Sequence, residues 1–157
     1  MKTIQSFTIN HDILGKGMYT SRTDGDVVTY DIRMKIPNNP ESDYLTNGAA
    51  HTFEHLFATY VRNSAASDKV VYVGPMGCLT GFYFLVRDSL SPAETIALVQ
   101  ESFAFIRDFE GEIPGSKRIE CGNFQMHDLP GAKAIAADMC QVLAHWTPEQ
   151  LIYPTAE

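Results

Sequence analysis

The chain has 157 residues, and this length predicts a single domain over residues 1–157 with a core of its own. Hydrophobic residues make up 45% of the sequence and charged residues 20%, an ordinary composition for a globular protein. The formal net charge of -7 argues against nucleic acid or an anionic membrane surface as a partner.

No targeting segment is visible in the sequence. The first residues, MKTIQS, lack the apolar run of a signal peptide, and no apolar stretch approaches the length of a membrane span. The three cysteines, an odd number without a secretory signal, favour reduced thiols. We therefore expect a cytoplasmic protein that does not enter a membrane.

The first third of the chain is typical of β structure. Phe7 and Ile9 alternate with polar residues, and a DG pair at residues 24–25 is a strong turn signal. Hydrophobic residues then occupy every second position over residues 28–36, which predicts a strand with one buried face. The PNNP run at residues 37–40 ends that strand and opens a loop.

The rest of the chain mixes helices with short strands. Helices are predicted over roughly residues 47–63, 91–109 and 131–145, and the second opens with an SPAE capping box. Strands at residues 70–73 and 79–86 flank a glycine-rich connection. Because there is no clean βαβ alternation, we expect an α+β fold with a mainly antiparallel sheet packed against helices.

The run HTFEH at residues 51–55 carries the strongest chemical signal. On a helix, positions i and i+4 share a face, so His51 and His55 could bind one divalent metal with Glu54 beside it as a proton carrier. This is the H-x-x-E-H order, the reverse of H-E-x-x-H. Catalytic metals usually take three protein ligands and leave one position open, so a third ligand is needed.

Cys121 is the best third ligand that the sequence offers. It lies in the triplet ECG, where the backbone can approach a metal closely, and a thiolate beside two imidazoles suits zinc or ferrous iron. Without the histidines, Cys121 would be read as a buried free cysteine. Cys140 is interpreted as such a buried cysteine, because it lies in the apolar stripe of the last helix. The role of His127 is left undecided.

Cys78 stands at the end of the glycine-rich turn GPMGC. Such a turn can present a side chain at a rim, and its free backbone amides favour a thiolate. The alternative is a small buried hydrophobic residue.

Three separated motifs together resemble the LuxS family of S-ribosylhomocysteine lyases. They are HTFEHL at residues 51–56, GPMGCLTGFY at residues 74–83, and ECG at residues 120–122 followed by MH at residues 126–127. The runs SFTINH at 6–11, GDVVTYDIR at 25–33 and PN at 37–38 are also similar to the family. The resemblance covers essentially the whole chain in order.

The resemblance implies a homodimer of the α+β, inverzincin-like fold with two active sites at the subunit interface. Each site would hold one ferrous ion, replaceable by zinc or cobalt. The implied reaction cleaves S-ribosylhomocysteine to homocysteine and 4,5-dihydroxy-2,3-pentanedione. That product is the precursor of the autoinducer-2 quorum signal, and the reaction recycles the S-adenosylhomocysteine left by methylation in the methionine cycle.

Eight positions match functional residues of the family. They are the metal ligands His51, His55 and Cys121, the acid/base groups Glu54 and Cys78, and the residues near the substrate Ser6, His11 and Arg33. The residue types suit the reaction, because moving a carbonyl along the sugar needs a Lewis acid and positioned bases. A cation such as Arg33 near Cys78 would favour its thiolate.

One position departs from the family pattern. Many members carry an acidic residue two positions before the residue that opens the Pro-Met-Gly-Cys turn, and here that position is Tyr72. The departure concerns a detail of substrate recognition.

Two other classes of protein remain open from the residues alone. An H-x-x-E-H metallopeptidase would take its third ligand from a downstream glutamate such as Glu94 or Glu101, but it would leave Cys78 and Cys121 without roles. A non-catalytic metal-binding protein would leave Cys78 unexplained.

Overall fold

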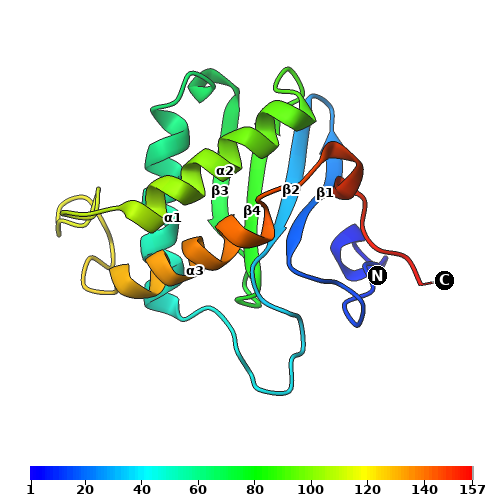
Figure 1. Cartoon of the computed structure of the whole chain (residues 1–157), viewed down its shortest axis with the longest axis horizontal. Coiled ribbons are helices and arrows are strands. Elements are labelled where there is room, and N and C mark those ends of the chain that lie inside the picture. Colours follow the sequence, from blue (N-terminus) through cyan, green and yellow to red (C-terminus); the bar gives the residue numbers. More distant parts are fainter. Residues whose placement is uncertain (157) are drawn as a thin grey trace.

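The computed structural model describes residues 1–156 and shows helices packed against one face of an antiparallel sheet (Figure 1). The four strands are β1 Gly17–Asp24, β2 Val27–Arg33, β3 Val70–Pro75 and β4 Gly81–Arg87. They pair in the order β1-β2-β4-β3, so β1 and β3 form the two edges. The helices are α1 Asn47–Arg62, α2 Pro92–Asp108 and α3 Leu129–Val142. The α+β prediction is confirmed.

Side chains that the sequence supplies at the helix starts cap the free backbone amides. Thr46 accepts a hydrogen bond from the amide of Ala49 at the start of α1, and Asp128 caps α3 in the same way. At α2, Ser91 and Glu94 form the predicted capping box. These caps fix where each helix begins, and therefore which of its residues face the sheet.

An aromatic cluster joins the helices to the sheet. Phe53 and Phe57 of α1, Phe82 and Phe84 of β4 and Phe103 of α2 are all 0% exposed. Neighbouring rings in this cluster lie 5.1–6.0 Å apart, within the range of favourable aromatic pairs. The apolar side of α1 is thereby committed to packing, and its histidines lie on a different side of the helix.

The two faces of the sheet have different partners. Successive residues of a strand point to opposite faces, and Tyr30 and Ile32 of β2 belong to the core beneath the helices. Asp31 and Arg33 therefore point to the other face. Both are nevertheless buried, because the chain ends cover part of that face; Figure 1 shows the two termini together beside β1, and Tyr153 donates a hydrogen bond to Asp31.

The structure corrects the predicted β structure at the N-terminus. Gln5–Phe7 forms a short 3-10 helix, and Phe7 is 74% exposed. Its backbone amides are satisfied within the turn, since the amide of Phe7 bonds to the carbonyl of Ile4. The strand predicted over residues 28–36 stops at Arg33, and Ile36 lies in an exposed loop.

The other predicted elements are found within two residues of their expected ends, apart from the end of the last helix, which stops at Val142. Two further 3-10 helices, Ser67–Lys69 and Pro148–Leu151, lie in connecting segments. Within residues 1–156, no helix is long and apolar enough to cross a membrane.

Phe103→Ala is expected to lower the free energy of unfolding by about 3–5 kcal/mol, because it opens a cavity between the rings of α1 and α2. Chemical denaturation at a fixed protein concentration measures the change. Ile119→Ala is the matched control, since Ile119 is 94% exposed and should change stability little. Equal effects of the two substitutions would contradict this account of the core.

Candidate functional site

Two backbone carbonyls fix the orientation of the motif histidines on α1. His51 Nδ1 lies 2.6 Å from the carbonyl oxygen of Met126, and His55 Nδ1 lies 2.8 Å from that of Pro114. A carbonyl oxygen can only accept, so each Nδ1 carries the hydrogen and each Nε2 keeps its lone pair. Metal-binding histidines are commonly oriented by such a bond from the second ring nitrogen.

Cys121 lies opposite the two free Nε2 atoms. Its Sγ is 3.5 Å from His51 Nε2 and 4.0 Å from His55 Nε2. Tetrahedral zinc, with bonds of about 2.1 Å to nitrogen and about 2.3 Å to sulfur, would hold a nitrogen and a sulfur about 3.6 Å apart. The three side chains are half-buried, and their donor atoms fit a single divalent ion.

His127 is a fourth member of this cluster. One donor atom of each of His51, His55, Cys121 and His127 lies within 4.8 Å of the others. The rings of His51 and His127 stack with centroids 4.1 Å apart. Burial lowers the pKa of His127, and the neighbouring His51 and His55 lower it further. His127 is therefore held in its neutral form.

A side-chain hydroxyl, and not a carbonyl, contacts the His127 ring. Thr52 Oγ1 accepts a hydrogen bond from the amide of Asp128 and lies 2.9 Å from His127 Nδ1, a contact in which either atom can donate. His127 Nε2 is buried and has no hydrogen-bond partner among residues 1–156. Because a hydroxyl can donate or accept, it does not select the tautomer of His127 as the carbonyls do for His51 and His55.

Glu54 lies on α1 next to His55 and is half-buried. Its carboxylate has no hydrogen bond or ion pair with the part of the chain that the structure describes, and it is not one of the clustered donors. A half-buried carboxylate without a protein partner beside a metal site is available to exchange protons.

Cys78 is exposed, and its sulfur lies 3.0 Å from Thr80 Oγ1. Arg33 Nη1 donates to the same hydroxyl oxygen at 2.7 Å. The cation that the sequence suggested for Cys78 is therefore present, with Thr80 between the two.

Arg33 belongs to a buried ion pair. Its Nε and Nη2 donate to the two carboxylate oxygens of Asp31 at 3.1 and 2.6 Å, and the side chains are 2% and 0% exposed. Tyr153 donates to Asp31 Oδ2 at 2.6 Å. Burial works against the charge of Arg33, but Asp31 outweighs it and raises the arginine pKa. Burial and Asp31 both raise the pKa of Tyr153, so its hydroxyl stays a donor.

The turn that carries Cys78 is conformationally demanding. Leu79 has a φ of 59°, a left-handed value that is unfavourable for a residue with a side chain. At the next strand, a Cβ on Gly81 would lie 2.2 Å from the carbonyl oxygen of Ile32, so only glycine allows β2 and β4 to approach there. The left-handed conformation at Leu79 and the close approach of the strands at Gly81 shape the turn in which Thr80 links Cys78 to the buried Arg33.

Ser6 lies on the sheet face opposite the helices. Together with Tyr72 and Tyr83, it lines a cavity of about 460 Å³. Tyr72 is 52% exposed, and its ring covers Gly74, where an added Cβ would lie 2.2 Å from the phenol oxygen. His11 is half-buried in the N-terminal segment, with Nδ1 2.9 Å from the carbonyl oxygen of Ile9.

The predicted site residues thus form two groups within one chain. The metal group consists of His51, His55 and Cys121 with Glu54 and His127, on the side of the sheet covered by α1. The thiol group consists of Cys78, Thr80 and Arg33, and Arg33 faces the other side, as Ser6 does. No hydrogen bond or ion pair within residues 1–156 joins the two groups.

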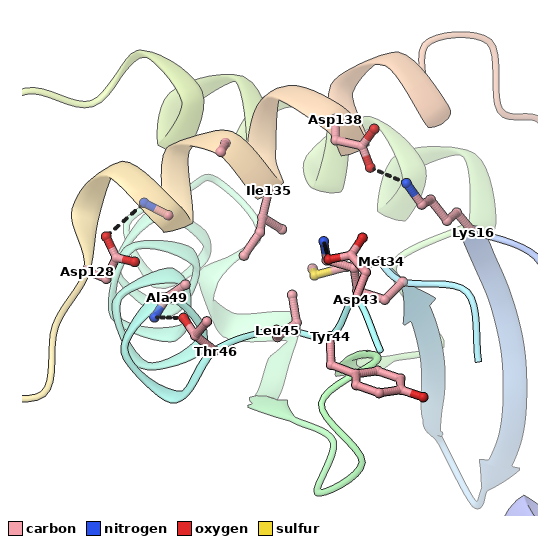
Figure 2. A pocket seen from close by; sticks show the side chains of 13 residues that line it. Lys16, Met34, Asp43, Tyr44, Leu45, Thr46, Ala49, Asp128, Ile135 and Asp138 are labelled. Carbon is pink, nitrogen blue, oxygen red and sulfur yellow. Dashed lines mark hydrogen bonds and ion pairs between the residues drawn. The ribbon is translucent and has the colours of Figure 1, made fainter. Parts of the chain in front are cut away.

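A second cavity of about 420 Å³ lies between α3 and the segment leading into α1 (Figure 2). Its lysines are engaged within the cavity, since Lys16 pairs with Asp138 at 2.8 Å and Lys35 with Asp43 at 2.7 Å. Asp128 is engaged as the cap of α3. No predicted site residue lines this cavity, and its charges already have partners.

Neither glutamate considered for a peptidase joins the metal group. Glu94 is exposed, and its carboxylate accepts a hydrogen bond from the Ser91 amide at 2.8 Å as part of the capping box. Glu101 is exposed on α2 and lines a separate surface groove with Tyr60 and Phe105. The clustered donors are nitrogen and sulfur atoms only.

Sequence reasoning missed Thr52 and Thr80, which make the polar contacts described above. Both lie within the motifs, between residues that had been predicted as site residues. This position in the sequence was the only indication of their role. The backbone carbonyls of Pro114 and Met126 could not be predicted, because no residue type in the sequence indicates which carbonyl will contact a histidine.

A family model described as S-Ribosylhomocysteinase (LuxS) matches residues 4–150. Relatives named S-ribosylhomocysteine lyase are similar over their whole length. The relative from Phocaeicola vulgatus is 52% identical, with 100% of both chains covered. The one from Porphyromonas gingivalis is 48% identical over 98% of this chain and 99% of the relative. That from Desulfotalea psychrophila is 42% identical over 99% and 100%. On this family match and these identities, the chain belongs to the S-ribosylhomocysteinase (LuxS) family.

Proposed function

We propose that this protein is a metal-dependent lyase that cleaves S-ribosylhomocysteine to homocysteine and 4,5-dihydroxy-2,3-pentanedione, the autoinducer-2 precursor. Its relatives are named S-ribosylhomocysteine lyase. The observation that carries the proposal is the metal group, in which two carbonyl-oriented imidazoles face one thiol sulfur.

His51, His55 and Cys121 would hold one divalent ion per chain. We infer from the family resemblance that ferrous iron is the native ion. Zinc or cobalt could replace it, because two imidazoles and a thiolate suit all three ions. A bound ion of this kind supplies a Lewis acid for the carbonyl and hydroxyl oxygens of the sugar. The ligand role of Cys121 needs a reduced thiol, which supports a cytoplasmic location.

Glu54 and Cys78 would move the protons. Carbonyl migration along ribose requires a base to remove a proton from one carbon and an acid to return a proton to its neighbour. Glu54 is next to the metal group and has a free carboxylate, so it suits transfer between sugar oxygens and carbon. Cys78 is exposed and its sulfur contacts the Thr80 hydroxyl, so it suits proton removal from carbon. Loss of a proton from carbon 4 then expels homocysteine thiolate from carbon 5.

A homodimer with composite active sites would unite the two groups. Ser6 and Arg33 lie on the sheet face opposite the helices, whereas the metal group lies on the helix side. A second chain could present its own Ser6, His11 and Arg33, together with the Cys78 linked to Arg33, to the first chain's metal group. The exposed side chains of Ile4 and Tyr72, at 55% and 52%, line the cavity on the open sheet face and support a partner at that face.

The proposal is tested by measuring homocysteine release and metal content in the same samples. The lyase should form homocysteine from S-ribosylhomocysteine in proportion to bound metal. Metal binding with no homocysteine but with peptide cleavage would favour a metallopeptidase. Metal binding without either activity would favour a non-catalytic metal protein.

His55→Ala is expected to abolish metal binding and lyase activity, because it removes one of three ligands. His127→Gln should keep most of the metal, because the proposed ligand set of His51, His55 and Cys121 does not include His127. Elemental analysis of the purified variants measures both, with the exposed His145→Ala as control. Full occupancy in His55→Ala would refute the ligand assignment.

Glu54→Gln and Cys78→Ala should keep their metal but lose at least about a hundredfold in rate, the usual lower value for a general acid or base. Cys140→Ala is the control for Cys78, because Cys140 is half-buried on α3 away from both groups. Turnover close to wild type in either variant would remove that residue from the mechanism.

The composite site predicts complementation between two inactive variants. His55→Ala and Cys78→Ala, unfolded together and refolded as a mixture, should regain about a quarter of wild-type activity, because half of random dimers hold one intact site. Sedimentation measures the oligomeric state of the same samples. Activity that stays absent in the mixture, or a fully active monomer, would contradict the composite site.

A further inference from the structure

A continuous chain of polar contacts runs from the C-terminal segment to Cys78. Tyr153 bonds to Asp31, Asp31 pairs with Arg33, Arg33 bonds to Thr80 Oγ1, and Thr80 Oγ1 lies 3.0 Å from Cys78 Sγ. Thr80 is 4% exposed, so its hydroxyl is shielded from water although Cys78 itself is exposed.

The chemistry of the partners fixes the direction of the last bond. A guanidinium can only donate, so Thr80 Oγ1 accepts from Arg33. The hydroxyl has one hydrogen, and Cys78 Sγ is its partner within residues 1–156. The reverse bond, from the thiol to the hydroxyl, would leave a buried hydroxyl hydrogen without an acceptor, which is unfavourable. Thr80 therefore donates to the sulfur.

The backbone of Thr80 is held as firmly as its side chain. Its carbonyl oxygen accepts from the amides of Met34 and Lys35 at 2.8 and 3.0 Å, just past the end of β2. Leu79 before it has a left-handed φ, and Gly81 after it is pressed against Ile32. The hydroxyl thus has a fixed position from which to orient the sulfur.

The ionisable groups around Cys78 come from three elements. Arg33 and Asp31 belong to β2, Tyr83 to β4, and Tyr153 to the C-terminal segment. Burial raises the pKa of both tyrosines, so they are neutral at neutral pH. Arg33 supplies the positive charge. It bonds to Thr80 Oγ1, which in turn contacts Cys78 Sγ.

We propose that Thr80 is a positioning residue that orients the Cys78 sulfur and stabilises its thiolate by passing on the polarisation of Arg33. Arg33 then acts on the thiol through Thr80, because all three of its guanidinium nitrogens already donate hydrogen bonds to Asp31 or Thr80. This inference rests on the proton-transfer role proposed for Cys78, but it concerns a different residue and a different measurement.

Alkylation of Cys78 at different pH values tests the role of Thr80 without relying on turnover. The zinc-loaded wild type, Thr80→Val and Thr80→Ser are treated with iodoacetamide from about pH 5 to about pH 9, a range that spans an ordinary thiol. Mass spectrometry follows the peptide that carries Cys78. Thr95→Val is the matched control, because Thr95 is 0% exposed and its hydroxyl bonds to the carbonyl of Ser91 away from the site.

Thr80→Val should slow alkylation at neutral pH about tenfold or more, because a charge-assisted donor is lost while the shape is kept. The pH of half-maximal alkylation should rise accordingly, and kcat should fall more than KM changes. Thr80→Ser should restore both values, and Thr95→Val should match wild type. If Thr80→Val does not fold, Thr80→Ala serves the same comparison.

Two results would overturn the inference, and they are distinguishable. Wild-type alkylation rates in Thr80→Val would exclude Thr80 while leaving the role of Cys78 intact. Slow wild-type alkylation that accelerates only above about pH 8, as for an ordinary thiol, would remove Cys78 as the resting base and the role of Thr80 with it. Equal slowing by Thr80→Val and Thr95→Val would show a general effect on folding and would also overturn the inference.

Discussion

The buried pair of Asp31 and Arg33 constrains more of this molecule than any other contact. It lies on the sheet face away from the helical core, where a charge without a partner would be costly. Removing one partner of such a pair typically costs about 3–5 kcal/mol, so both residues and the donors around them are held together. Tyr153 anchors the C-terminal segment to this pair, and Thr80 anchors the Cys78 turn to it. The sheet, the C-terminal segment and the exposed Cys78 thiol are thereby all linked to this one ion pair.

The metal group depends on a different constraint, the dual use of α1. One side of this helix packs its phenylalanines into the core, and another presents His51 and His55 to the segment between α2 and α3. The carbonyls of Pro114 and Met126 come from that segment and select the ring nitrogen that stays free. His127, beside the same cluster, contacts the Thr52 hydroxyl instead of a carbonyl. The groups that orient the rings therefore differ among the histidines of one cluster.

Periodicity and capping signals were sufficient to predict the helices and the antiparallel sheet. The H-x-x-E-H pattern and its need for a third ligand predicted the clustering of Cys121 with the α1 histidines. The same alternation was misleading at Phe7, because alternation cannot distinguish a strand from a short turn that satisfies its own amides. The carbonyl partners were beyond prediction, since any residue can supply a carbonyl and only the fold selects which. The burial of Arg33 was likewise hidden, because it depends on Tyr153, far away in the sequence.

Tyr72 and Gly74 are neighbours on the same face of edge strand β3, and the phenol ring lies over the glycine. An aromatic ring covering a strand glycine protects backbone that would otherwise be open at a sheet edge. No side chain at residue 74 can coexist with this ring position. Any residue larger than glycine there would displace the Tyr72 ring and uncover this part of the sheet edge.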